Sequence, residues 1–363
     1  MSDEKALLAA IWEHPHEDTP RLMYADWLEE TGKPADGARA EFIRVQCGLA
    51  QLDRWDTERR APLEKREKEL WKKWSRQWRS DLPKSQKNCE FSRGFPLFDL
   101  SGYEVSELVR LTEVELEGAP LSRYHYDIEG RGILDVLKWP GLRFQQLFSP
   151  RPPRLPKGWV KKVALCPALK NVSELCTIDC KLTPADIQML LDAWQDRHLP
   201  ILRLACEIGN EGMAVLATHP TAAKVRVLDL RGAKLTVAGI RKLCSSSYLT
   251  QIHTLDLWDN PFGNAGLKEL LRWRYLSGLR WLNLEQTKIT TVGAIALAEC
   301  SAIGELRELL IGGNHIRADG CRALARSPHL NRLTTLNLYE VPGIEDAAVQ
   351  KELRQRFKKA VDW

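Results

Sequence analysis

The sequence predicts an α/β solenoid of stacked strand–helix units that follows an all-α N-terminal domain. Two observations predict this fold class. Leucine pairs recur every 27 residues through the second half of the chain, and residues 2–80 carry apolar side chains at helical spacing. One strand and one helix cannot bury their shared apolar face alone, so units that repeat at a fixed spacing are expected to stack into one continuous core.

The repeat has a defined pattern of positions. Five units share the same first leucine, and these residues are Leu228, Leu255, Leu282, Leu309 and Leu336. An apolar residue follows two positions later, as Leu257 follows Leu255, and this alternation predicts a short strand with both side chains facing inward. Next comes a turn position, where Asn260 or Asn314 can bond to neighbouring backbone groups. A glycine such as Gly266 then lets the start of a helix pack closely against its strand.

Weaker copies of the pattern precede these five units. Leu202 and Leu204 begin one copy, and Leu175 begins another in which Thr177 takes the second position. We therefore predict seven units between about residue 172 and residue 350.

These residues resemble the leucine-rich repeats of the ribonuclease-inhibitor and Ran GTPase-activating-protein type. The resemblance covers about half of the chain. It implies a leucine-rich-repeat solenoid, a right-handed α/β horseshoe with a parallel sheet on its concave face and helices outside. It also implies protein–protein binding, the use to which most members of this family are put.

The regions that flank the regular repeats at 172–345 are expected to be atypical, because terminal units cap the core. Residues 86–171 are predicted to form an irregular or degenerate N-terminal part of the solenoid. Val114 and Leu116 keep the repeat spacing there, and Phe95 belongs to a candidate first, capping strand. At the other end the register breaks at residues 341–343, and residues 346–363 are predicted to be a C-terminal capping helix.

Residues 1–85 are predicted to be a separate helical domain. Its second helix is expected to begin at Thr19-Pro20 and to stop at Gly32. The segments 20–30 and 41–46 resemble the bacterial repeat-companion domain, a family found mostly as the N-terminal neighbour of leucine-rich repeats. The resemblance implies a bacterial protein of this two-part architecture. It names no partner, because the biochemical role of that family is not established.

Composition and motifs favour a cytoplasmic protein that is not an enzyme. The formal net charge of +5 permits an acidic partner without arguing for one, and no stretch reaches the roughly 18 apolar residues of a membrane span. The 9 cysteines lack paired spacing, which is typical of thiols in a reducing compartment. His14, His16 and Asp18 lie in a proline-interrupted segment, where an exposed loop is favoured over a metal site. The sequence contains no G-x-x-x-x-G-K-[ST] loop, no G-x-S-x-G elbow and no H-E-x-x-H helix, and we predict neither a metal nor a cofactor.

The residues that flank the inward leucines are predicted to point outward on the concave side of the sheet. They form a first row of Val227, Thr254, Trp281, Glu308 and Thr335, a middle row of Asp229, Asp256, Asn283, Leu310 and Asn337, and a third row of Arg231, Trp258, Glu285, Gly312 and Tyr339. Aromatic residues and arginine dominate interface energies, so this side is predicted to bind a partner. The predicted contacts are Trp258, Trp281, Tyr339, Arg231, Asp229, Asp256, Asn283 and Glu285. For the middle row, the favoured alternative is that Asp and Asn are generic to such strands.

A helix expected to begin near Thr57 offers a second candidate surface. Basic residues interleaved with aromatic ones can bind phosphates and stack on bases, and the candidate nucleic-acid contacts are Lys72, Lys73, Arg76, Arg79 and Trp71. The favoured alternative is a solvated helix packed on its own domain. Leu70, Trp74 and Trp78 are spaced as one apolar stripe, and nearby glutamates dilute the positive charge.

Together these patterns favour a scaffold, either an adaptor or an inhibitor, that binds another protein through its concave face. The N-terminal domain is expected to cap the solenoid or to recruit a second component. One alternative is a nucleic-acid-binding protein that uses residues 57–80 and the basic C-terminal end. Another is a regulator of a GTPase or of another enzyme, which rests on analogy of fold alone, and no catalytic arginine is assigned.

Overall fold

The computed structural model describes residues 3–13, 17–52, 54–80, 90–97, 159–165, 174–195 and 199–362. These residues divide into two compact units, one within 3–97 and one within 159–362. The first is mainly helical, and the second alternates strands with helices. No helix within the described ranges is both long enough and apolar enough to cross a membrane.

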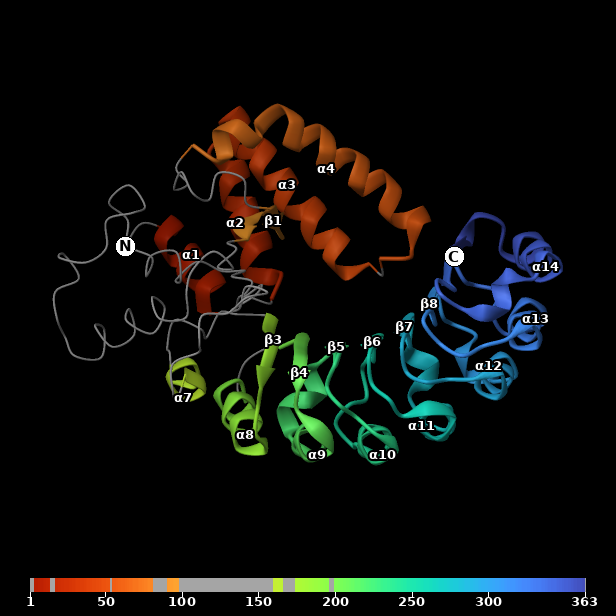
Figure 1. Cartoon of the computed structure of the whole chain (residues 1–363). Helices are drawn as coiled ribbons and strands as arrows, with labels where there is room; N and C mark the ends of the chain where they lie inside the picture. The colour runs from red at the N-terminus through yellow and green to blue at the C-terminus, as the bar shows by residue number, and fades with distance from the viewer. Residues whose placement is uncertain are drawn as a thin grey trace. The chain divides into compact units, whose positions relative to one another are not determined.

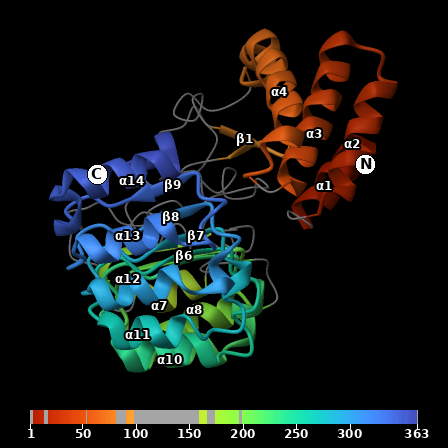
Figure 2. The ribbon, with the colours of Figure 1, turned by 90° about the vertical axis from the view of Figure 1, so that its right-hand side faces the viewer.

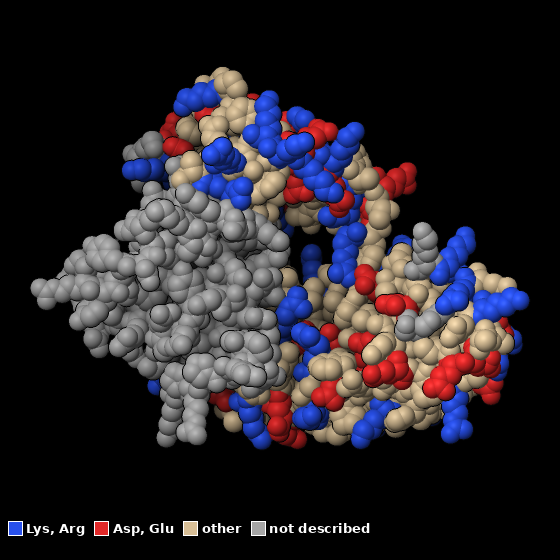
Figure 3. All heavy atoms as spheres, turned by 45° about the horizontal axis from the view of Figure 1, so that its top comes forward, with Lys and Arg blue, Asp and Glu red and all other residues tan. Residues whose placement is uncertain are grey.

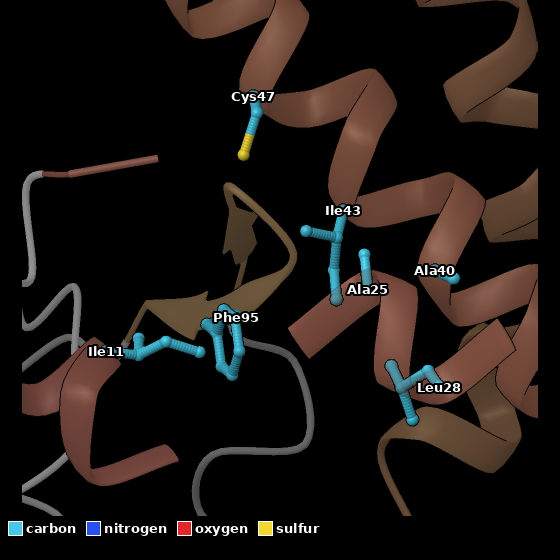
Figure 4. Close-up of a cluster of buried hydrophobic side chains, with 7 residues drawn as sticks. All are labelled: Ile11, Ala25, Leu28, Ala40, Ile43, Cys47 and Phe95. Carbon is cyan, nitrogen blue, oxygen red and sulfur yellow. The ribbon is translucent and has the colours of Figure 1, made fainter. Parts of the chain in front are cut away.

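The described part of the first unit contains α1 (Asp3–Glu13), α2 (Thr19–Glu30), α3 (Pro34–Gln51) and α4 (Thr57–Trp78). Consecutive helices pack against one another. As predicted, α2 begins at Thr19 with a proline in its first turn and ends before Gly32. A buried cluster joins helices to a hairpin, and its members are Ile11, Ala25, Leu28, Ala40, Ile43, Cys47 and Phe95 (Figure 4).

The hairpin is short and antiparallel. Strand β1 (Glu90–Ser92) pairs with β2 (Phe95–Leu97), and the turn residues Arg93 and Gly94 have φ values of 50° and 85°. A two-residue turn in which both φ angles are positive matches the right-handed twist of the strands that it joins. The Arg-Gly pair thus provides the geometry that closes this hairpin.

The hairpin changes the predicted domain boundary. Residues 90–97 pack with the helices of the first unit, whereas the solenoid was predicted to start at residue 86. The reason is that Phe95 fills the core between α1, α2 and α3 instead of pairing with the parallel sheet. Residues 98–158 lie outside the described residues, and their place in the solenoid stays a prediction. Helix α7 (Trp159–Ala164) does belong to the second unit, where it packs beside α8.

Gln46 on α3 fastens the hairpin to the helices. Its Nε2 donates to the carbonyl oxygen of Phe91 at 3.0 Å and to Glu67 on α4 at 2.7 Å, and its Oε1 accepts from the N–H of Gly94 at 2.6 Å. The fit is close, because a Cβ atom at Gly94 would lie 2.2 Å from Cγ1 of Ile43. Gln46 is buried, so these bonds satisfy backbone groups that water does not reach.

In the second unit the strands are β3 (Glu174–Lys181), β4 (Ile201–Glu207), β5 (Val227–Asp229), β6 (Thr254–Asp256), β7 (Trp281–Asn283), β8 (Glu308–Leu310), β9 (Thr335–Asn337) and β10 (Val361–Asp362). After α7, the helices are α8 (Pro184–Ala193), α9 (Gly209–Thr218), α10 (Val237–Ser245), α11 (Gly263–Leu270), α12 (Thr291–Ala298), α13 (Ala318–Arg326) and α14 (Ala347–Phe357). Short 3-10 helices lie at Pro220–Lys224, Leu276–Gly278, Ser301–Ile303, Pro342–Glu345 and Lys358–Ala360.

These strands form one parallel sheet whose order follows the chain, from β3 at one edge to β10 at the other. Figure 1 shows the strands on the inner side of an arc and the helices on its outer side. Seen from the helical side, α10 to α14 lie one after another in chain order (Figure 2). A strand occurs at each of the seven predicted units, so the structure confirms the predicted α/β solenoid, which is of the leucine-rich-repeat kind.

Inward-facing leucines fill the space between the sheet and the helices. The first leucine of each regular unit is 0% exposed, and these are Leu228, Leu255, Leu282, Leu309 and Leu336. Burial of one such side chain stabilises the fold by about 1.5–3 kcal/mol. Neighbouring helices approach closely where the pattern has its glycine, because a Cβ atom at Gly320 on α13 would lie 3.2 Å from Cβ of Ala294 on α12.

Buried amides close the turns after the strands. The Nδ2 of Asn314 donates to the carbonyl oxygens of Leu284 and Ile311 at 2.7 and 2.9 Å, and its Oδ1 accepts from the N–H of Ile289 at 2.9 Å. Two of these three partners belong to the preceding unit. Asn260 bonds in the same way two repeats earlier, to the carbonyl of Leu230 at 2.8 Å. Each amide therefore satisfies backbone groups of its own unit and of its neighbour.

The C-terminal end departs from the predicted single helix over 346–363. Helix α14 ends at Phe357, and Val361 and Asp362 then pair in parallel with Leu336 and Asn337 of β9. Lys358, with a φ of 53°, turns the chain back toward the sheet. The chain thus adds an eighth strand to the edge that β9 would otherwise expose.

We expect Gln46→Leu to loosen the hairpin, because the N–H of Gly94 and the carbonyl of Phe91 would be buried without their partner. The free energy of opening of residues 90–97 should fall by about 2 kcal/mol. Hydrogen exchange of the full chain measures this, with the exposed Gln77→Ala on α4 as control. Unchanged exchange in the hairpin would show that Gln46 does not hold it.

We expect Asn314→Ala to lower the free energy of unfolding by about 3 kcal/mol, since three buried backbone groups lose their partner together. Urea unfolding of the second unit measures the change. His315→Ala, at the adjacent exposed position, is the control and should shift the free energy by less than about 0.5 kcal/mol. Equal effects from the two variants would contradict the role assigned to the buried amide.

Candidate functional site

The strand register sets the three predicted rows side by side. Trp281 pairs with Thr254 on one side and Glu308 on the other, and Asn283 pairs with Asp256 and Leu310. The rows continue past the strand ends, because the N–H of Asp259 bonds to the carbonyl of Glu285, next to Trp258, at 3.1 Å. Neighbouring side chains of a row are therefore about 4.8 Å apart at the backbone.

The middle row has a structural task. Asp229, Asp256 and Asn283 are 1%, 9% and 5% exposed, and each accepts a hydrogen bond from the N–H two residues later. The distances are 3.1 Å to Arg231, 3.0 Å to Trp258 and 2.8 Å to Glu285; Asn337 holds Tyr339 in the same way at 2.8 Å. This supports the alternative that these polar residues are general features of the strands. Their second effect is to fix the backbone that carries the third row.

Two arginines converge on Asp229. Nη2 of Arg231 lies 2.8 Å from Oδ2 of Asp229, and Nη1 of Arg203 on β4 lies 3.7 Å from the same oxygen. Nε of Arg231 is 3.6 Å from Oδ2 of Asp256. Arg203 was not among the predicted contacts, although its position between Leu202 and Leu204 places it in the middle row, because the unit that contains it departs from the regular spacing.

The acidic groups nearest the tryptophans are short of positive charge. Burial and the neighbouring Asp229 carboxylate raise the pKa of Asp256 to about 7, against the lowering effect of the Trp258 N–H and Arg231. Burial also raises the pKa of Glu285, which Asn283 partly offsets by a hydrogen bond. Both carboxyl groups are therefore easier to protonate than an exposed acid.

The aromatic members of the rows are open to solvent to different degrees. Trp258 is 37% exposed and Tyr339 is 59% exposed, whereas Trp281 is half-buried. Arg231 and Glu285, on either side of Trp258 in the third row, are half-buried. The third row thus places Trp258 between two charged side chains, on a backbone that the middle row holds in place.

On α4 the predicted nucleic-acid contacts divide into two groups. Lys72, Lys73 and Arg76 are exposed. The ring of Trp71 instead packs against Phe42 and Phe91, with centroid distances of 5.8 and 5.0 Å. The indole of Trp71 is therefore engaged within its own unit, which favours the predicted alternative of a helix packed on its domain.

Arg79 is also turned toward the helical unit. Its Nε donates to the carbonyl of Ser75 at 3.2 Å, and its guanidinium lies 5.2 Å from the ring centroid of Trp71. Acidic partners of α4 gather in its first part, where Arg66 pairs with Glu41 at 2.6 Å and with Glu69 at 3.0 Å. Residues 70–80 contain no acidic side chain, so positive charge remains on this end of the helix. Figure 3 shows basic and acidic side chains intermixed on the helical unit.

Within the described ranges, no three His, Cys, Asp or Glu side chains are grouped to hold a metal ion. His14 and His16 lie outside these ranges.

The pKa of Asp256 predicts a pH dependence of stability. Its value of about 7 exceeds the ordinary 3.8, so the folded protein holds a proton that the unfolded chain releases between these pH values. This contribution to stability is complete below about pH 4 and is lost as the pH rises through about 7.

Asp256→Asn keeps an acceptor for the Trp258 N–H and removes the charge. Urea unfolding should show the variant more stable than the wild type at pH 8, by on the order of 2 kcal/mol, with a smaller difference at pH 5. Asp259→Asn, whose side chain is 46% exposed, is the matched control. A variant less stable than the wild type at pH 8 would contradict the assigned pKa.

The geometry of both surfaces stands without support from a known relative. No protein-family model matches the chain, and no curated protein is significantly similar to it. Function must therefore be argued from the two surfaces described above.

Proposed function

We propose that this chain is a protein-interaction scaffold, an adaptor or an inhibitor, that binds another protein on the concave side of its solenoid. One observation carries the proposal. Trp258, Trp281 and Tyr339 stand on the solvent side of a sheet whose other side already contains the apolar core. Large aromatic residues that are grouped on a surface, with arginine nearby, are the usual anchors of protein interfaces.

The backbone supports the same proposal. Because Asp256 and Asn337 bond to the N–H groups of Trp258 and Tyr339, the two aromatic residues are held on a rigid frame before any partner arrives. This chain then loses less conformational freedom on binding than it would if the aromatic residues lay on a flexible loop. The sheet is also built from one repeat after another, so it provides an extended surface of regular spacing.

The helical unit is proposed to recruit a second component. Its resemblance to the bacterial repeat-companion domain names no partner, and the chemistry of α4 offers only one suggestion. The exposed Lys72, Lys73 and Arg76 form a basic surface that suits phosphate groups. Since Trp71 is packed within the unit, nucleic-acid binding here would rest on charge and not on base stacking. We keep it as the second candidate function, and regulation of a GTPase or another enzyme as a third without an assigned residue.

A capture experiment separates the first two candidates. The full chain is immobilised as wild type, as Trp258→Ala/Trp281→Ala and as Lys72→Glu/Lys73→Glu/Arg76→Glu, and exposed to a cell lysate at low and moderate salt. The scaffold proposal predicts a protein that the wild type and the α4 variant retain and that the double tryptophan variant loses. Moderate salt should weaken this retention little, because the anchors are aromatic.

The control for the tryptophan variant is Met189→Ala/Val292→Ala, which removes exposed apolar side chains from the helical side of the same unit. It should retain the partner. Retention of the same protein by the double tryptophan variant would overturn the proposed interface. Capture of nucleic acid that salt releases, and that the α4 variant alone fails to bind, would establish the second candidate instead.

A further inference from the structure

A small surface patch on β6 and β7 places two tryptophans, Trp258 and Trp281, on either side of the carboxyl group of Asp256. Asp256 and Asn283 lie side by side at its centre. Trp258 follows Asp256 on one strand, and Trp281 precedes Asn283 on the next, so the indoles stand on opposite sides of the pair. Strand geometry separates their backbones by about 14 Å, with Asp256 and Asn283 between them. Glu285 adjoins Trp258 in the third row.

The charges around this patch do not balance within the described residues. Arg203 and Arg231 both point to Asp229, and the contact of Arg231 with Asp256 is long, at 3.6 Å. No cationic side chain among the described residues forms an ion pair with Glu285. Burial raises the pKa of both Asp256 and Glu285, and the neighbouring Asp229 carboxylate raises that of Asp256 further.

We propose that the partner inserts a lysine or arginine side chain between Trp258 and Trp281, where Asp256 and Glu285 accept its hydrogen bonds. This inference rests on the proposed scaffold function and specifies the chemistry of its partner. The faces of both indoles offer the negative electrostatic surface that attracts cations.

A cation fits this patch better than the other possible occupants. An apolar side chain would cover Asp256 and Glu285 without giving them a partner, and burial of an unpaired carboxylate is unfavourable. An acidic side chain would add like charge to two carboxyl groups that are already hard to ionise. A guanidinium or ammonium group instead supplies further donors and positive charge to both acids and stacks on the indoles.

Binding of a cation is then coupled to release of a proton. The groups that face Asp256 are Asp229 on β5, Arg231 just after that strand, Asn283 on β7 and the N–H of Trp258, two residues further along its own chain segment. An inserted cation lowers the pKa of Asp256 from its value of about 7, so affinity rises as the pH increases through that range. Below it, the protonated carboxyl group attracts the cation less.

The test uses a fluorescein-labelled peptide of alternating glycine and arginine, with two matched peptides that carry citrulline or glutamate in place of arginine. Fluorescence anisotropy of the full chain should show binding of the arginine peptide and not of the others. Asp256→Asn/Glu285→Gln should weaken it about tenfold, as should Trp258→Ala/Trp281→Ala, and the wild-type affinity should rise between pH 6 and pH 8. Asp259→Asn, on the adjacent exposed turn, should leave the affinity unchanged.

Three results would overturn the proposal: equal binding of the citrulline peptide, unchanged affinity of the carboxylate variant, or unchanged affinity of the tryptophan variant. Weaker binding by the carboxylate variant would not result from unfolding, because Asp256→Asn removes a charge that is unfavourable in the folded protein. The scaffold function is judged separately. A protein captured from lysate that the tryptophan variant loses and the carboxylate variant keeps leaves the scaffold role standing and rejects the cation.

Discussion

The whole second unit depends on one constraint, which is that no repeat can satisfy its own buried groups. The Oδ1 of Asn260 accepts from the N–H of Leu235 in the preceding unit, while its Nδ2 donates to carbonyls of both units. The leucines of each strand likewise need the next strand to exclude water. The repeats therefore hold one another in register. Because the strands share this register, the outward-facing side chains of successive repeats are aligned in regular rows.

The division between inner and outer sides determines what the surface can do. Core packing fixes Leu255 and Leu257 on one side of β6 and its extension, and leaves Thr254, Asp256 and Trp258 on the other. Asp256 then has two tasks, because its carboxylate holds the Trp258 backbone and also lies, largely buried, on the outer side of the sheet beside that residue. The carboxylate of Asp256 is poorly solvated, which lowers the stability of the fold when the group is charged. A partner that neutralises this charge would explain why the residue is present.

Much of this architecture could be predicted from the sequence, because the repeat is written at fixed spacing. Leu228 and its successors identified every strand of the regular units, and the same spacing identified the three outer rows. The hairpin was not foreseen, since its register depends on the contact of Phe95 with distant helices and on Gln46, which is far from it in sequence. The final strand was also missed, because two residues after a helix carry no periodic signal.

The candidate sites were predictable to different extents. Spacing alone indicated that Trp258 and Tyr339 lie outside, but the packing of Trp71 against Phe42 depends on tertiary contacts that no local pattern contains. The shortage of positive charge at Asp256 could not be inferred either, because it follows from which carboxylate Arg203 and Arg231 approach. Patterns thus locate side chains on faces, whereas contacts decide which of them remain available.

The central claim is that the outer aromatic residues serve a partner and not the fold. The most direct measurement is urea unfolding of Trp258→Ala and Tyr339→Ala beside Leu257→Ala, which removes an inward side chain of the same layer. We expect losses in the free energy of unfolding of about 1 kcal/mol or less for the two aromatic variants and about 2–5 kcal/mol for the leucine variant. Losses of equal size would contradict it, because Trp258 and Tyr339 would then be structural.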